Sequence, residues 1–160
     1  MRPWLLAGLL LASLNAAADC RQTTGAMDDM AEAKLVLAGP GERPVRLTVL
    51  VADDHRKRAA GFQNVCPETI DSTAIYFEFE RPRRPNFHMN NVKAALDIAF
   101  IDAGGVIVDI QRMEPYVLGA RHHQTYSPSG EVAAALEVRA GYFAEQGITK
   151  GDWRVESLDR

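Results

Sequence analysis

Three side chains that can exchange protons, His88, Asp97 and Glu137, lie in otherwise apolar segments of this chain. Two carboxylic acids on either side of a substrate bond can catalyse hydrolysis, and the distance between them decides the mechanism. A carboxyl group that is buried among apolar neighbours must otherwise be paired or hydrogen-bonded. The sequence sets no distance between Asp97 and Glu137, so these residues fit either an acid–base site or a structural role.

A second set of polar side chains could form a binding pocket. We expect a concavity that contains His88, Asn91 and Asp97, roofed in part by the loop 114–130. Arg58, from a short helix, is the expected partner of Asp97, either in a structural ion pair or in the pocket itself. An apolar wall with a few converging polar groups is the usual make-up of a binding site. The expected ligand-binding residues are His88, Asn90, Asn91, Asp97, Arg58, Tyr116 and Tyr126.

The motifs of metal and cofactor sites are missing from the sequence. His122 and His123 are adjacent on an extended loop and point apart, with no third ligand at a suitable spacing. The acidic residues Asp53 and Asp54 precede an expected helix, where capping explains them. The chain also lacks G-x-S-x-G, a phosphate-binding glycine loop and H-E-x-x-H. We therefore expect no metal and no cofactor, while an enzymatic activity stays open.

Cys20 and Cys66 are the two cysteines of the chain. In an oxidising compartment we expect them to form a disulfide. A reactive thiol at Cys66 is disfavoured because its neighbours Val65 and Pro67 supply neither a base nor a cation. Lipidation of Cys20 is the other alternative, although Asp19 stands where lipoprotein cleavage needs a small residue.

Residues 1–18 have the pattern of a signal peptide. A basic start at Arg2 is followed by an apolar stretch over 4–14 and by three alanines at 16–18. The apolar stretch is shorter than the roughly 20 residues of a transmembrane helix. We therefore expect a periplasmic or secreted protein without a stable membrane span after removal of the signal; a buried N-terminal helix is the alternative.

The charge of the chain argues against nucleic acid as a partner. Removing residues 1–18 takes away Arg2 and changes the formal net charge from −3 to −4. Nucleic-acid binding needs clustered basic residues, and prolines interrupt the basic run at 81–84. We expect a monomer whose partner is an unidentified small molecule, a glycan or an envelope protein.

Hydrophobic alternation predicts many short strands. Residues 19–33 lack periodicity and are expected to form a flexible arm before a single β domain over 34–160. Many strands with few helices indicate a mainly β fold, either an antiparallel β-sandwich or an open barrel, with two or three short helices. The expected strands are 34–38, 45–51, 73–79, 87–92, 96–101, 106–113, 132–139 and 153–155, and the expected helices are 54–60 and 140–146.

Several segments together resemble the signature of the family called domain of unknown function 192. Residues 58–62 correspond to its R-x-x-G-L, residues 87–91 to F-W-M-K-N, residues 96–102 to L-D-I-x-F-I-D, and residues 136–152 to L-E-x-x-x-G…G-I-x-x-G-D. The resemblance covers about residues 44–156. It implies a β domain and leaves the activity open.

Three residues depart from the family wording. His88 stands in place of the usual Trp, Asn90 in place of Lys, and Gln63 in place of a common Met. A ligand that the family bound through that aromatic ring and cation would be held differently here.

Two functions fit these features. The leading hypothesis is an exported non-enzymatic domain that binds a small molecule, a glycan or an envelope protein, since loops on rigid β scaffolds often serve recognition. The alternative is a hydrolase or lyase that acts on an envelope polymer through Asp97, Glu137 and His88.

Overall fold

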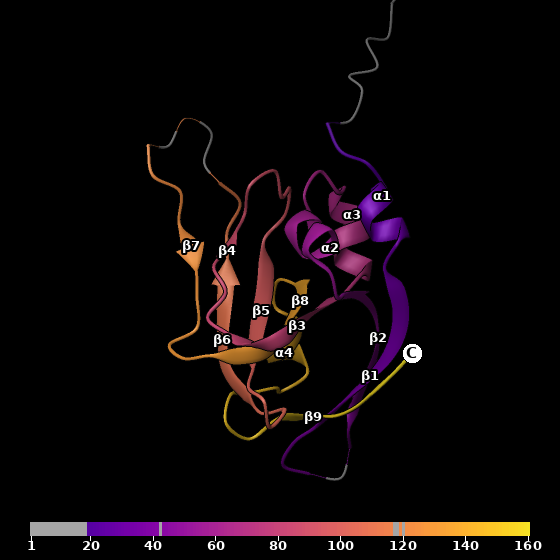
Figure 1. Ribbon diagram of the computed structural model, residues 1–160, viewed down its shortest axis with the longest axis vertical. Coiled ribbons are helices and arrows are strands. Elements are labelled where there is room, and N and C mark those ends of the chain that lie inside the picture. Colours follow the sequence, from indigo (N-terminus) through magenta and orange to yellow (C-terminus); the bar gives the residue numbers. More distant parts are fainter. Residues whose placement is uncertain (1–18, 42, 117–118, 120) are drawn as a thin grey trace, which may run out of the picture.

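A computed structural model describes residues 19–41, 43–116, 119 and 121–160 of the chain (Figure 1). These residues form nine strands and four short helices. In chain order the elements are α1 (Gly25–Asp28), β1 (Ala31–Ala38), β2 (Val45–Ala52), α2 (His55–Ala60), α3 (Pro67–Ser72), β3 (Ile75–Arg83), β4 (Phe87–His88), β5 (Leu96–Ile101), β6 (Ile107–Met113), β7 (Thr125–Tyr126), β8 (Val132–Arg139), α4 (Tyr142–Glu145) and β9 (Arg154–Asp159).

Seven strands form one curled sheet in the order β6-β5-β8-β3-β2-β1-β9, while β4 and β7 form a separate pair. Neighbours in the large sheet are antiparallel except β2 and β3, which are parallel. A parallel pair needs a crossover connection, and α2 and α3 lie in it. The expectation of a mainly β fold is confirmed, with one parallel pair and with four short helices where two or three were expected.

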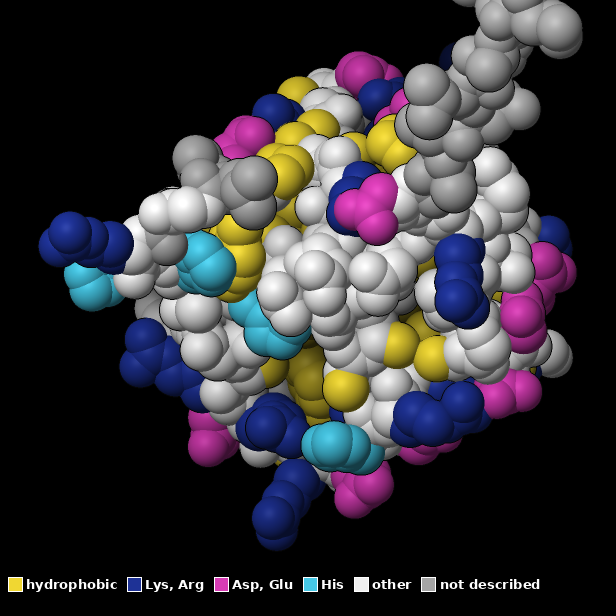
Figure 2. Space-filling model, turned by 90° about the horizontal axis from the view of Figure 1, so that it is seen from above, with side chains coloured by type: hydrophobic (Ala, Val, Ile, Leu, Met, Phe, Trp, Pro, Cys, Tyr) yellow, Lys and Arg dark blue, Asp and Glu magenta, His cyan; other side chains and the backbone are white. Residues whose placement is uncertain are grey.

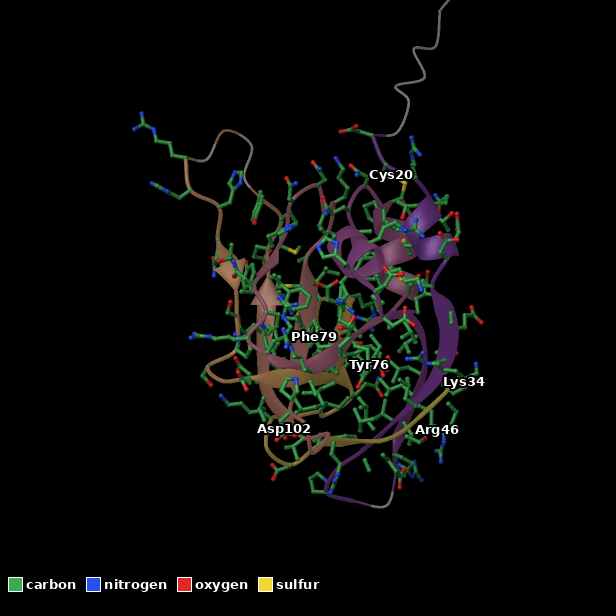
Figure 3. The ribbon with its side chains drawn as sticks, in the orientation of Figure 1. Cys20, Lys34, Arg46, Tyr76, Phe79 and Asp102 are labelled. Carbon is green, nitrogen blue, oxygen red and sulfur yellow. A yellow bond between two sulfur atoms is a disulfide. The ribbon has the colours of Figure 1, made fainter. Side chains whose placement is uncertain are left out.

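The curl brings the two edge strands of the sheet together at one end. The Ile107 N–H donates to the Trp153 carbonyl, and the Val155 N–H donates to the Gly105 carbonyl, both at 2.8 Å. Asp102, in the turn between β5 and β6, lies at this end, whereas Cys20 lies at the opposite end, which carries α1, α2 and α3 (Figure 3). The sheet is therefore a half-barrel, partly closed at the end away from the helices.

The segment 19–33, expected to be a flexible arm, is attached to the domain. It contains α1 and the first residues of β1, which begins at Ala31 rather than at Lys34. The expected disulfide is confirmed: Cys20 and Cys66 are bonded, with their Cα atoms 4.9 Å apart. Backbone hydrogen bonds of 2.8 Å, from the Arg21 N–H to Asn64 and from the Cys66 N–H to Arg21, reinforce the attachment. The expected signal peptide lies outside the described residues.

Apolar residues are buried on both faces of the sheet because successive side chains of a strand face opposite ways. On β5, Ile98 and Phe100 join the core beneath α1, α2 and α3, here called the helix-side core, which also contains Phe62 and Phe77. Ala99 and Ile101 join the core on the other face, here called the α4-side core, which contains Phe143 of α4. Every residue of β5 is thus buried. Within the described residues, no helix is long and apolar enough to cross a membrane.

Candidate functional site

Glu137 is a buried carboxylic acid near the middle of the sheet. It lies on β8, directly opposite Ile75 of β3 and Ile98 of β5. Both neighbours belong to the helix-side core, so the Glu137 side chain enters an apolar layer and is 5 % exposed. Burial raises the pKa of the Glu137 carboxyl from its ordinary value of 4.5 to about 8, and neither a hydrogen bond nor a nearby cation offsets this effect. Among the described residues Glu137 therefore has no partner, and its acid is mostly protonated at neutral pH.

The Glu137 carboxyl faces a cavity of about 260 Å³. Gly61, which ends α2 with a φ of 45°, forms part of its wall. A Cβ added at Gly61 would lie 3.6 Å from Cζ of Phe77 and 3.8 Å from Oε2 of Glu137. The positive φ also favours glycine. Gly61 thus leaves room above the acid that any other residue would reduce.

The cavity has aromatic walls and basic residues around the acid. The four phenylalanines that line it are Phe62, Phe77, Phe79 and Phe87, and the four basic side chains are His55, Arg58, Arg83 and His88. Phe87 packs edge-on against Phe77, with ring centroids 5.1 Å apart. Seen from above, the molecule shows recessed hydrophobic side chains between histidine and Lys or Arg side chains (Figure 2). An apolar pocket with a few polar groups is the usual form of a small-molecule site.

Of the residues expected to bind a ligand, Arg58 and His88 line the cavity. Asn90 lies beside it: its side-chain nitrogen is 3.5 Å from Oε1 of Gln63, which lines the cavity, and its backbone N–H donates to Nδ1 of His88 at 3.3 Å. Asn91 is outside. It is exposed and adopts a φ of 55°, and its carbonyl accepts a 2.8 Å hydrogen bond from the Asn64 N–H. Asn91 therefore shapes a turn.

The two tyrosines expected to roof the pocket have other contacts. Tyr126 is buried on β7 opposite Phe87, and its hydroxyl accepts a 3.0 Å hydrogen bond from the Glu114 N–H. Tyr116 stacks on His123, with ring centroids 4.1 Å apart. No described residue of the loop 114–130 lines the cavity. The expected roof is therefore absent from the described part of this loop.

Asp97 has a structural role instead of a place in the cavity. Its Oδ1 accepts a 2.5 Å hydrogen bond from Nε of Arg112, the residue directly opposite on β6, and its Oδ2 accepts a 2.8 Å bond from the Gly141 N–H. Asp97 thus joins β6, β5 and the connection from β8 to α4. The expected pairing of Asp97 with Arg58 is wrong, because Nη1 of Arg58 donates to the carbonyls of Asp53 and Glu78 at 2.7 and 2.8 Å.

Asp97 and Glu137 lie on opposite faces of the sheet. On the paired strands β5 and β8, Asp97 is opposite Val138, and Glu137 is opposite Ile98. Val138 belongs to the α4-side core and Ile98 to the helix-side core. The sheet backbone therefore separates the two acids, and they cannot act together on one bond. Among the described residues, no group of three or more His, Cys, Asp or Glu side chains is placed to hold a metal ion.

The chain is a small, mainly β domain in which the buried acid Glu137 lies beneath the end of α2. The chain belongs to the family DUF192, described as Uncharacterized ACR, whose model matches residues 36–155. No curated protein matches the chain. The family assignment made from the sequence motifs is thus confirmed.

Solved structures of two bacterial proteins share the fold. A protein from Sinorhizobium meliloti 1021, described as a candidate transcription regulator, is 25% identical with a TM-score of 0.67 over 79% of this chain and 95% of its own. A protein of unknown function from Novosphingobium aromaticivorans DSM 12444 is 21% identical with a TM-score of 0.63 over 84% of this chain and 99% of its own. The second likeness concerns the fold alone.

Three of the motifs that carry the family resemblance meet at the cavity. The R-x-x-G motif contributes Arg58 and Gly61, the F-W-M-K-N motif contributes His88, and the L-E motif contributes Glu137. Sequence reasoning considered Glu137 only as a partner of Asp97 and did not include Gly61 in the site. The available signal was the lone acid in the apolar run 132–138.

Proposed function

We propose that this protein binds a small molecule in the cavity above Glu137. The observation that carries the proposal is the Glu137 carboxyl itself, which is buried, unpartnered and faces open space. This carboxyl forms no side-chain hydrogen bond to a described residue and borders the cavity. A ligand that supplies a donor would give the acid a hydrogen-bond partner in a place of low polarity, where such a bond is strong.

The size and lining of the cavity support a small ligand. Its volume of about 260 Å³ is just below the range of about 300–1,000 Å³ for pockets that hold drug-sized molecules. The phenylalanine walls favour an apolar middle part, and the acid and basic side chains favour polar ends. A single sugar residue or a small metabolite fits these properties better than a protein surface does.

The experiment is an NMR fragment screen that follows backbone amide shifts of the labelled, oxidised protein. We expect hits to shift Gly61, His88 and Glu137 together. The variant Ala60→Phe, which puts a bulky ring into the cavity lining, should lose these shifts. The control Ala144→Phe, at an exposed position of α4, should keep them. Fragments that shift other regions only, or that bind Ala60→Phe as well as the unmodified protein, would contradict the proposal.

A hydrolase or lyase remains the second candidate, in a reduced form. Glu137 and His88 line the same cavity, and a carboxylic acid with a raised pKa is suited to general acid catalysis. Asp97 is no longer part of this hypothesis because it faces the other side of the sheet. If the protein turns over an envelope polymer and Glu137→Gln abolishes this turnover, the enzyme candidate is favoured. If a ligand binds without turnover, the binding function is favoured.

We also propose that the protein is exported to the periplasm or secreted. The support is the signal-like sequence over 1–18 together with the Cys20–Cys66 disulfide, since disulfides persist in oxidising compartments. Mass spectrometry of the protein from an envelope fraction should find an N-terminus at Asp19 and a disulfide-linked peptide pair. An uncleaved N-terminus with both thiols free in that fraction would contradict export.

A further inference from the structure

The cavity keeps its acid and its strongest cations at different depths. Glu137 is buried in the sheet, whereas Arg58 is half-buried and Arg83 is exposed. Both guanidinium groups flank the ring of Phe79, with their central carbons 6.0 and 5.7 Å from its centroid. Phe79 is labelled in Figure 3 on β3, in the middle of the molecule. The arrangement is an acid at the base and two cations around one aromatic ring at the mouth.

Neither end of the cavity has a charged partner among the described residues. In this part of the chain, neither Arg58 nor Arg83 forms a salt bridge. Nη1 of Arg58 donates to two backbone carbonyls. The acid and the cations also do not neutralise each other, because burial alone acts on the pKa of Glu137. The histidines at the cavity, His55 and His88, are exposed. The pocket therefore offers a carboxyl group at its base and two guanidinium groups at its mouth.

We propose that the ligand is a small zwitterion, with a protonated amine against Glu137 and a carboxylate against Arg58 and Arg83. This inference rests on the proposed function and names the chemical class of its ligand. Charge-assisted hydrogen bonds would form at both ends, and the phenylalanine walls would contact the hydrocarbon between them. A ligand with an amine but no carboxylate must pass two guanidinium groups, which repel it. A ligand with a carboxylate but no amine leaves the Glu137 carboxyl without a partner. A molecule that carries both charges satisfies both ends.

Calorimetry with ω-amino acids tests the proposal because the distance between their charges can be varied. The probes have one to four methylene groups, from glycine to 5-aminopentanoate, and butylamine and butyrate serve as singly charged references. Titrations near pH 8.5 populate the Glu137 carboxylate. We expect at least one ω-amino acid to bind tenfold or more tightly than either reference. Equal or weaker binding of every zwitterion would overturn the proposal.

Variants separate the two ends of the ligand. Glu137→Gln should weaken the best amino acid at least tenfold without weakening butyrate, whereas Arg83→Gln should weaken the amino acid and butyrate but not butylamine. Arg46, an exposed residue of β2 (Figure 3), does not line the cavity, so Arg46→Gln is the matched control and should change nothing. An amino acid that binds Glu137→Gln normally would refute the role of the acid.

The two proposals fail in different ways. If the zwitterions do not bind but neutral fragments still shift Gly61 and Glu137 in the NMR screen, the ligand class is wrong and the binding function stands. If neither zwitterions nor fragments occupy the cavity, both proposals are wrong.

Discussion

Glu137 should make the stability of this protein fall as pH rises. The folded-state pKa of about 8 exceeds the ordinary value of 4.5, so between these values the folded chain keeps a proton that the unfolded chain has lost. Stability from this group is fully present below pH 4.5 and is lost as pH rises toward 8. The slope is at most about 1.4 kcal/mol for each pH unit in this window, so the loss between pH 5 and 7 is about 2–3 kcal/mol.

The variant Glu137→Gln removes this titration while nearly keeping the side-chain shape. Urea unfolding at pH 5, 6 and 7 gives the free energy of unfolding of both proteins. We expect the variant to gain about 2–3 kcal/mol relative to the unmodified protein over this range. All other ionisable groups are shared by the two proteins, so the difference between them isolates Glu137. The control Glu68→Gln, at an exposed carboxyl on α3, should follow the unmodified protein. If the free energies of unfolding of Glu137→Gln and the unmodified protein change with pH in parallel, the buried carboxyl has a partner or stays hydrated.

Three further changes should affect the fold rather than the cavity. Asp97→Asn weakens the bonds to Arg112 and Gly141 and should cost about 1–3 kcal/mol in urea unfolding with fragment binding intact; an unchanged free energy of unfolding would contradict its structural role. A Cβ on Gly39 would overlap the Trp153 ring, so Gly39→Ala should lower the free energy of unfolding by about 1–3 kcal/mol. The displaced ring should also change the tryptophan fluorescence. A native spectrum together with a native melting temperature would speak against this contact. Reducing the disulfide, which spans 46 residues of sequence, should cost about 4 kcal/mol in the chain-entropy model, and equal melting temperatures with and without reductant would refute that estimate.

Local sequence patterns predicted most of the large sheet. The strands over 96–101 and 132–139 coincide with β5 and β8, because their apolar residues are buried on both faces and are bounded by turn residues. The helix α3 was missed because its six residues carry only one fully buried apolar side chain, Ile70. The parallel pairing of β2 and β3 depends on the crossover, which no local pattern encodes.

The candidate site was harder to predict because it depends on pairing between distant segments. Asp97 lies opposite Arg112 across the β5–β6 hairpin, and this partner could have been found by counting outward from the turn at 102–105. Arg58, the expected partner, lines the cavity on the other face of the sheet instead. The cavity itself is formed by α2, the end of β3, β4 and Glu137 of β8, and their approach is a property of the tertiary fold.

Glu137 also has a consequence for how the chain selects its strand alignment during folding. A shift of β8 by one residue relative to β5 would turn every side chain of the strand to the other face. Leu136 and Val138 would then face the cavity, and the acid would enter the α4-side core, where Asp97 and Phe143 already lie. A misaligned sheet would thus bury a carboxyl group away from any opening. Glu137 therefore penalises the slipped alignment more than an apolar residue could, and Glu137→Leu should refold with more misaligned product even where its native state is stable.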